Sequence, residues 1–285
     1  MGTNGDAIKR GHMRLVDLGE INAPLWLFGG AYSNLQAVEA LVEAANAAGA
    51  RLIGTGDMVG YGADPVAVLE RLSGRADMIA GNVERQLGAG ARDCGCGFAT
   101  GSACETLSRG WYAHADASIG TKWRAWMRAL PDMVTFRHHG RRYGVLHGGV
   151  HNISRFLWPS SPAADFRSEI AALTATLGPV DAIIAGHCGL AFERVIDGVH
   201  WINAGVIGMP PHDGRAQTRY ATLGPDGACL HRLSYDHAGA ARAMRAAGLG
   251  PQYADALQSG FWPSQEVLPE ALRRSDAARH PGAKA

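Results

Sequence analysis

The stretch GDMVGYGADP, Gly56 to Pro65, decides the fold class. It directly follows a short apolar run, Arg51 to Thr55, which predicts a buried strand. Asp64-Pro65 at its end supplies a capping residue and a first-turn proline, so a helix is expected to begin there. A strand that ends in Gly56-Asp57 and leads through a loop into a helix is typical of an α/β protein.

The same alternation continues on both sides of this stretch. Upstream, the run PLWLF (Pro24 to Phe28) predicts a strand, and a helix capped by Ser33 or Asn34 follows it as far as Gly49. Downstream, the second helix stops at Gly74, and residues 77–80 predict a third strand. The order β-α-β-α-β indicates an α/β fold with parallel strands.

The rest of the chain is less regular. Residues 84–117 are rich in Gly and Cys and are interpreted as an inserted loop region, and residues 236–285 as a helical tail. Further helices are expected near 123–130 and 165–178. Strands are expected at 133–137, 142–146, 181–185, 190–196, 199–203, 218–223 and 229–234, the last two closing a second sheet. Without an internal repeat or a linker, residues 1–285 are interpreted as one domain.

Composition and charge exclude several classes of protein. Of the 285 residues, 47% are hydrophobic and 19% charged, which excludes general disorder. A net charge of +1 argues against a nucleic-acid or membrane-surface partner. No apolar run reaches membrane-spanning length, no signal peptide is evident, and an odd five cysteines do not indicate a disulfide framework. We therefore expect a cytoplasmic protein, whose oligomeric state the sequence leaves open.

Four polar residues stand beside Gly at predicted strand ends: Asp57, Asn82, His147 and His187. Ligands of open α/β sheets bind outside the carboxyl ends of strands. One such residue alone is more often a turn or helix cap, but four together favour a metal site. A carboxylate, an amide oxygen and two imidazoles suit Zn, Mn or Fe(II) better than Mg or Ca.

These segments resemble blocks of the calcineurin-like metallophosphoesterases, in the branch of small bacterial phosphodiesterases and nucleotide phosphatases. The similar blocks, spread over residues 24–235, are GDMVGYGADP (56–65), GNVE (81–84), HGG (147–149), GHCG (186–189) and NAGVIGMPPHDG (203–214). The resemblance implies a four-layer αββα sandwich and a metal-dependent hydrolase with a two-metal site between its sheets.

Three departures from the family pattern fall on one of the two implied metals. Gly30 and Tyr32 stand where the resemblance implies an Asp and a His ligand, and Gly189 replaces a second His. The ligands implied for the other metal all remain: Asp57, Asn82, His147 and His187. We therefore predict a single divalent transition metal (Mn, Fe or Zn), with Asn82 and His147 also acting in catalysis.

The leading hypothesis is hydrolysis of a phosphate mono- or diester by a metal-bound water, with a small phosphorylated substrate or a nucleotide. Tyr32 either fills the vacated metal position or points its hydroxyl at the phosphate. Val83 stands where family members often carry a proton-donating His, and His151 is a candidate replacement, although a turn His is the commoner case. Further candidate substrate-binding residues are Gly30, Asn34, Gly148 and Arg155, with Arg215 and Trp158.

Two other functions remain open. The protein is alternatively a non-catalytic module that binds a phosphorylated ligand or nucleotide, or a mononuclear metal enzyme with non-phosphatase chemistry. Cys94, Cys96 and Cys104 are candidate ligands of a separate Zn, with His114 or Cys188 as the fourth. Their C-x-C-x7-C spacing matches no standard pattern, so buried or turn thiols are the commoner explanation.

Overall fold

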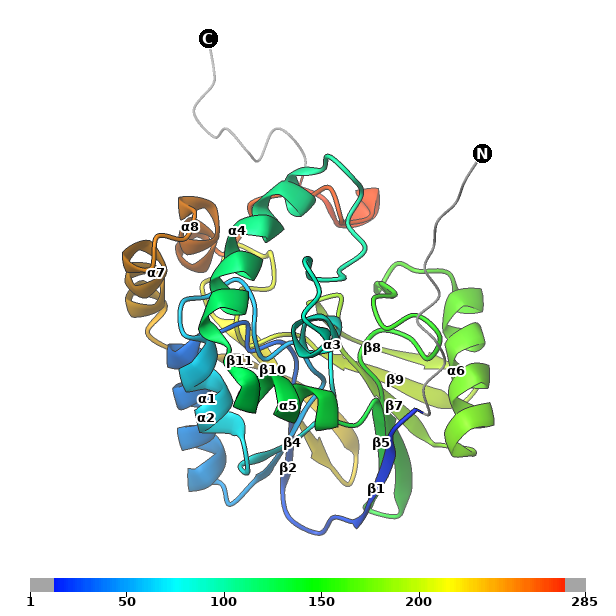
Figure 1. Ribbon diagram of the computed structural model, residues 1–285. Helices are drawn as coiled ribbons and strands as arrows, with labels where there is room; N and C mark the ends of the chain where they lie inside the picture. Colours follow the sequence, from blue (N-terminus) through cyan, green and yellow to red (C-terminus); the bar gives the residue numbers. More distant parts are fainter. Residues whose placement is uncertain (1–12, 275–285) are drawn as a thin grey trace.

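The computed structural model describes residues 13–274, in which short apolar strands alternate with amphipathic helices (Figure 1). The strands are β1 (Leu15–Glu20), β2 (Leu25–Phe28), β3 (Arg51–Gly54), β4 (Ala76–Met78), β5 (Met133–His138), β6 (Arg141–Val145), β7 (Ala182–Ala185), β8 (Ala191–Ile196), β9 (Val199–Ala204), β10 (Thr218–Gly224) and β11 (Gly227–Leu233). The helices are α1 (Leu35–Ala47), α2 (Pro65–Leu72), α3 (Asn82–Ala89), α4 (Ala103–Ser118), α5 (Thr121–Ala129), α6 (Ala163–Leu177), α7 (His237–Ala246), α8 (Pro251–Ser259) and the 3-10 helix η1 (Glu270–Leu272).

The strands form two sheets. One has the order β11-β10-β2-β3-β4, with β2, β3 and β4 parallel as predicted from the β-α-β-α-β pattern. The other has the order β1-β5-β6-β7-β9-β8 and contains the two expected hairpins, β5-β6 and β8-β9. The prediction for residues 218–234 was wrong in one respect: β10 pairs with β2, so this hairpin completes the first sheet rather than a second one.

The two sheets pack face to face because their strands are apolar on both faces. In β2, Leu25 and Leu27 point between the sheets, whereas Phe28 packs against the outer helices, following the two-residue period of a strand. From the opposite sheet, Phe136 and Ile184 contribute to the same inter-sheet core. All of these side chains are at most 1% exposed.

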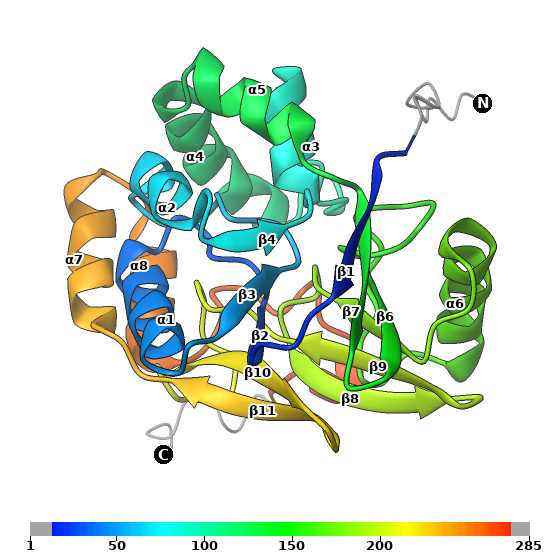
Figure 2. The same cartoon turned by 90° about the horizontal axis from the view of Figure 1, so that it is seen from below.

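Helices cover both outer faces (Figure 2). On one side, α1 buries Val38, Leu41, Val42 and Ala45, which recur at helical spacing. On the other, α6 buries Phe166 and Leu173 against the six-stranded sheet. The result is the four-layer αββα sandwich that the sequence predicts.

Residues 84–117 are mostly helical, which corrects their interpretation as a loop region. Helices α3 and α4 occupy most of the segment, and the irregular part lies between Ala89 and Ala103. The Ser102 hydroxyl caps α4 by accepting the Glu105 amide at 3.1 Å. Helix α4 buries Trp111, Tyr112 and Ala115, which recur at helical spacing. The segment was interpreted as a loop because it contains many Gly and Cys residues.

Both ends of the described chain extend the sandwich. Strand β1, which the sequence did not indicate, pairs in parallel with β5, and its register shifts between Asp17 and Glu20. The predicted helical tail consists of α7, α8 and η1, and its last residues, 275–285, lie outside the described part of the chain. None of the helices within residues 13–274 combines the length and the apolar character needed to cross a bilayer.

Candidate metal centre and its cavity

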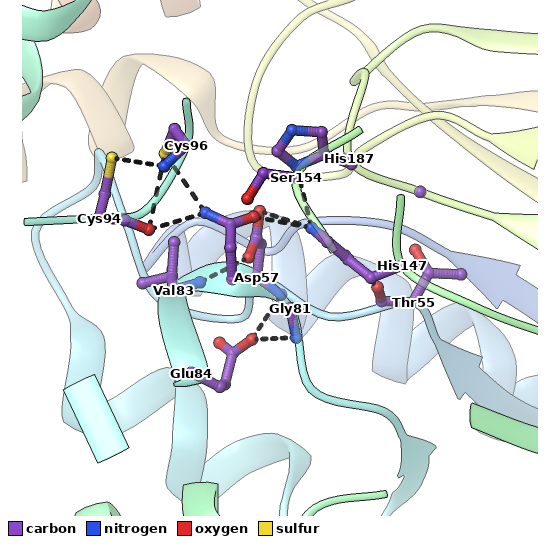
Figure 3. A network of polar contacts seen from close by, with 12 residues as sticks. Thr55, Asp57, Gly81, Val83, Glu84, Cys94, Cys96, His147, Ser154 and His187 are labelled. Atoms are coloured by element: carbon purple, nitrogen blue, oxygen red, sulfur yellow. Dashed lines mark hydrogen bonds and ion pairs between the residues drawn. The ribbon is translucent and has the colours of Figure 1, made fainter. Parts of the chain in front are cut away.

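Four loops that follow strands bring together the polar residues singled out from the sequence. Asp57 follows β3, and Asn82 begins α3 after β4. His147 follows β6, and His187 follows β7, so each sheet supplies two of the four. All four residues are buried, with between 1% and 8% exposed. Figure 3 shows Asp57, His147 and His187 gathered around one point.

The imidazole of His147 defines the geometry of this point. Its Nδ1 lies 2.6 Å from the Thr55 carbonyl oxygen, which can only accept a hydrogen bond. Nδ1 therefore carries the hydrogen, and Nε2 of the neutral ring presents a lone pair. That Nε2 lies 3.3 Å from Asp57 Oδ2, 3.0 Å from Asn82 Oδ1 and 3.1 Å from His187 Nδ1.

The amide of Asn82 is oriented by a second contact. Its Nδ2 donates to the Cys94 carbonyl at 2.8 Å, which turns Oδ1 toward His147. A carboxylate oxygen, an amide oxygen and two imidazole nitrogens thus converge on one point. Such a buried cluster of acceptors is unfavourable unless a cation lies among them. The Asp57, His147 and His187 ligand atoms lie within 4.8 Å of one another, which fits a divalent transition metal.

A buried carboxylate holds the Asp57 loop in position. Glu84 accepts hydrogen bonds from the backbone amides of Asp57, Met58 and Gly81 at 2.8 to 2.9 Å. Asp57 has φ 58° and His187 has φ 61°, a left-handed backbone that costs about 1–3 kcal/mol for non-glycine residues. Burial and the Asp57 carboxylate raise the pKa of Glu84 to about 7.

The negative charge of Asp57 attracts a proton as it would attract a metal ion. Although burial opposes it, the Asp57 carboxylate raises the pKa of His147. Burial, together with His147, lowers the pKa of His187 to about 3. The two rings therefore do not both carry a positive charge, and the neutral His187 ring keeps one nitrogen lone pair at neutral pH.

The segments that build this centre also match a known family. Residues 31–226, well over half of the chain, match the model of the calcineurin-like phosphoesterase superfamily domain. The chain belongs to the calcineurin-like phosphoesterase superfamily. It is thus a member of a family of metal-dependent phosphoester hydrolases, as the order of the sequence blocks predicts.

Solved structures of other proteins share the fold. A metallophosphoesterase from Sphaerobacter thermophilus has 20% sequence identity and a TM-score of 0.64, covering 84% of this chain and 100% of that one. A hypothetical protein from Pyrococcus horikoshii OT3 has 15% identity and a TM-score of 0.68, covering 84% and 99%. A comparison with curated proteins finds no match.

Aromatic rings lie beside Gly30 and Gly189, two of the positions where the sequence departs from the family pattern. A Cβ added to Gly30 would overlap the Tyr32 ring, 2.8 Å from its Cδ1. A Cβ at Gly189, which has φ 78°, would lie 3.3 Å from Trp262 Cζ2. The Tyr32 ring packs edge-on against Tyr61, with centroids 4.6 Å apart. The Tyr32 ring thus packs beside Gly30 and also lines the cavity described below.

A cavity opens in front of Asp57 and His187. It encloses about 700 Å³ of space, counting its open mouth. Its wall is mostly aromatic and apolar, with three thiols and no lysine or arginine from the described part of the chain. The lining residues are Tyr32, Asp57, Tyr61, Cys96, Phe98, Cys104, Phe156, Trp158, His187, Cys188, Gly189, Val206, Met209, Tyr253, Trp262, Pro263, Ser264 and Val267.

Several residues predicted to bind substrate lie away from this wall. Asn34 caps α1 by accepting the Ala37 amide, and its Nδ2 donates to the Gly208 carbonyl at 3.1 Å. A Cβ at Gly148 would lie 2.8 Å from the Arg155 carbonyl oxygen, so this glycine allows two backbone segments to pack closely.

The predicted basic and proton-donating groups are also placed elsewhere. Arg155 forms ion pairs with Glu169 at 2.6 Å and with Asp165 at 3.0 Å. His151 and Arg215 are exposed and do not line the cavity. Of this set, Trp158 does lie in the wall, where it stacks on Phe156.

The structure does not support the separate Zn site. Within residues 13–274, the only group of three or more potential ligand side chains is Asp57, His147 and His187. The Cys94 sulfur accepts the Cys96 amide at 3.4 Å, and the Cys96 sulfur accepts Asn82 Nδ2 at 3.3 Å. Cys104, in the first turn of α4, lies beside Ser264 and Val267 of the tail.

Three features of the site were not assigned from the sequence. Glu84 had a signal, because it stands three residues after the helix-capping Gly81, which is capping-box spacing. The Thr55 carbonyl is a backbone atom that no side-chain pattern encodes. Trp262 lies beyond the matched segment 31–226, in the tail, where the sequence shows no family block.

Proposed function

We propose that this protein hydrolyses phosphate mono- or diesters with a single divalent transition metal (Mn, Fe or Zn). Asp57, Asn82, His147 and His187 would hold the ion. The observation that carries the proposal is the convergence of a carboxylate oxygen, an amide oxygen and two imidazole nitrogens on one buried point. A divalent ion bound there polarises a phosphoryl oxygen and lowers the pKa of water.

The chain's own residues orient this site. Thr55 fixes the ring of His147, Cys94 fixes the amide of Asn82, and Glu84 fixes the backbone that carries Asp57. Asp57 and His187 reach the cavity wall, so a substrate in the cavity would contact the centre from their side. The rings of Tyr32 and Trp262 in the other half support one ion rather than two.

The substrate is proposed to be a small phosphorylated molecule, with nucleotides as one class to be tested. A cytoplasmic location remains part of the proposal. All five cysteines are free thiols in the structure, which is consistent with a reducing compartment.

A second candidate function is binding without turnover. It is favoured by the aromatic rings beside Gly30 and Gly189, because without a second ion there is one positive charge fewer to stabilise the transition state. Turnover with the metal-loaded protein separates the two candidates.

The test compares His147→Ala with His139→Ala. His139 is an exposed turn residue, so its loss removes an imidazole without touching the centre. After loading with Mn, we expect the His147 variant to bind the ion at least about 100-fold more weakly and to lose phosphoester hydrolysis, because a direct ligand matters more than an outer-shell partner. Metal content and hydrolysis of bis(4-nitrophenyl) phosphate are the measurements. Equal metal content in the two variants would reject the assigned site.

A further inference from the structure

The cavity in front of the candidate metal centre is lined in part by residues beyond the family match. Part of its wall comes from the segment before α4 and its first turn, with Cys96, Phe98 and Cys104. Another part comes from residues 253–267, beyond the family match at 31–226. Glu266 joins the two parts by accepting the Ala103 amide at 2.7 Å. Figure 1 shows η1, near the end of the described residues, close to the start of α4.

Flat rings dominate this wall. Phe156 and Trp158 stack with an interplanar angle of 3°, and Phe156 also lies against His187, with centroids 4.2 Å apart. Tyr61 packs edge-on against both Tyr32 and Tyr253. Aromatic pairs contribute stabilisation beyond the area they bury. The wall therefore favours an uncharged ligand group with a planar ring.

The lack of cationic side chains in the wall limits the negative charge that a bound phosphate group can carry. Among the lining residues there is no lysine or arginine, and Arg155 is engaged by Glu169 and Asp165. The proposed ion would therefore be the main positive charge that a phosphate meets in the cavity. Placing a second negative charge in such apolar surroundings is costly. A diester, with one negative charge, fits better than a monoester dianion or a polyphosphate.

The acidity of the side chains in the wall limits which leaving groups can depart. Apart from Asp57 and His187, its titratable side chains are phenols and thiols, whose ordinary pKa values lie at about 8.5 or above. Such groups are weak acids for protonating a departing oxygen at neutral pH. An aryl oxide can leave without being protonated, whereas an alkoxide needs a proton in order to leave.

We propose that the substrate is a phosphodiester monoanion in which one ester group is an uncharged aromatic alcohol lying in this cavity. The proposal rests on the proposed function above. The oxygen of water bonds to phosphorus, and the bond from phosphorus to the aryl oxygen breaks. The aryl oxide leaves with the electron pair, the proton of the water goes to solvent, and the other alcohol remains as a phosphate monoester.

The test uses the Mn-loaded full chain and three compounds: bis(4-nitrophenyl) phosphate, 4-nitrophenyl phosphate and ATP. The first two share a leaving group and differ in charge. We expect kcat/KM for the diester to exceed that for the monoester and for ATP at least tenfold. Better turnover of the monoester or of ATP would overturn the substrate class and leave the proposed function standing. No His147-dependent hydrolysis of any of the three would overturn the proposed function itself.

Two variants test the wall directly. Ser264→Lys adds a cation to the wall, and we expect the preference for the diester over the monoester to fall at least tenfold. The control is Gln258→Lys, on the exposed face of α8, which should leave this preference unchanged. Phe98→Ala removes one ring and should lower kcat/KM for the diester about tenfold, and it provides the test if Ser264→Lys does not fold. If Phe98→Ala leaves the diester unaffected, or Ser264→Lys folds and keeps the wild-type preference, the cavity is not the binding site of the aromatic group.

Discussion

At the scale of single residues, the site is governed by where lone pairs point. The Thr55 carbonyl fixes the hydrogen of His147 on Nδ1, and the Cys94 carbonyl turns Asn82 Oδ1 toward His147 Nε2. Neither partner uses a side chain. The sequence therefore predicts which residues gather at the centre but not how they are oriented, because backbone carbonyls are present at every position.

Restoring the second half of the centre needs more than the three family ligands. Gly30→Asp, Tyr32→His and Gly189→His supply the missing groups, but Trp262 lies 3.3 Å from where the Gly189 Cβ would be. We expect the triple variant to bind one ion and the same variant with Trp262→Ala to bind two. A second ion should raise phosphoester hydrolysis about 10²- to 10³-fold. Metal content per chain and kcat/KM are the measurements.

The control for this experiment is Trp262→Ala alone, which creates space without ligands and should bind one ion. Two ions in the triple variant with Trp262 intact would contradict the claim that the ring blocks the position. The backbone also contributes, since His at Gly189 would take φ 78°, a strain of about 1–3 kcal/mol.

At the scale of elements, the tail beyond β11 is attached to the site through His212. Its Nδ1 accepts the Trp262 amide at 2.9 Å, and its Nε2 donates to Gln265 Oε1 at 3.1 Å. Protonation of Nδ1 would place two N–H groups against each other. Burial lowers the pKa of His212, in agreement with this arrangement.

Acid should therefore loosen the tail. The pKa of His212 in the folded state lies below the unfolded value of 6.5, so His212 binds more protons once the tail has detached. Its contribution to stability is therefore present above pH 6.5 and is lost as the pH falls. We expect protection of residues 260–268 from hydrogen exchange, corrected for the intrinsic rate, to fall up to about tenfold per pH unit below pH 6.5. His212→Gln should remove this dependence, whereas His139→Gln, at an exposed turn, should keep it. Equal pH dependence in both variants would contradict the role of His212.

The elements differ in how well the sequence predicts them, for physical reasons. The central strands β2, β3 and β7 are buried on both faces and are therefore continuous apolar runs. Strand β1 is largely exposed, so it carries no such run. Helix α4 follows a Gly- and Cys-rich stretch and was hidden by that composition, although Trp111 and Ala115 keep helical spacing.

At the scale of the whole molecule, one core joins the two sheets, and we propose that the described residues unfold as one cooperative unit. Leu27 is fully buried in this core. Leu27→Ala should lower the free energy of unfolding by about 2–5 kcal/mol. It should shift the far-ultraviolet circular dichroism and tryptophan fluorescence transitions together. Val195→Ala, at a position that is 69% exposed, should change stability by less than about 0.5 kcal/mol. Separate transitions for the two signals would contradict a single unit.

The global architecture follows from family blocks that lie at strand ends, whereas the cavity does not. Its outer wall combines Phe98, before α4, with Trp262 and Val267 in the tail. These segments are far apart in the chain, and only the folded structure brings them to one place. The sequence thus predicts the proposed metal ligands better than the residues that surround a substrate.

The irregular pairing of β1 has a consequence for how molecules meet in concentrated solution. β1 is the end strand of its sheet in the described residues, and Leu15 and Val16 are 41% and 38% exposed. A long, flat strand of this kind is a template for pairing with another chain. Here Gly19, at φ 70°, and the register shift after Asp17 break the ladder, and two acidic side chains repel a second copy. This local irregularity therefore makes β1 a poorer template for pairing between molecules, and Gly19→Val would tend to straighten the strand.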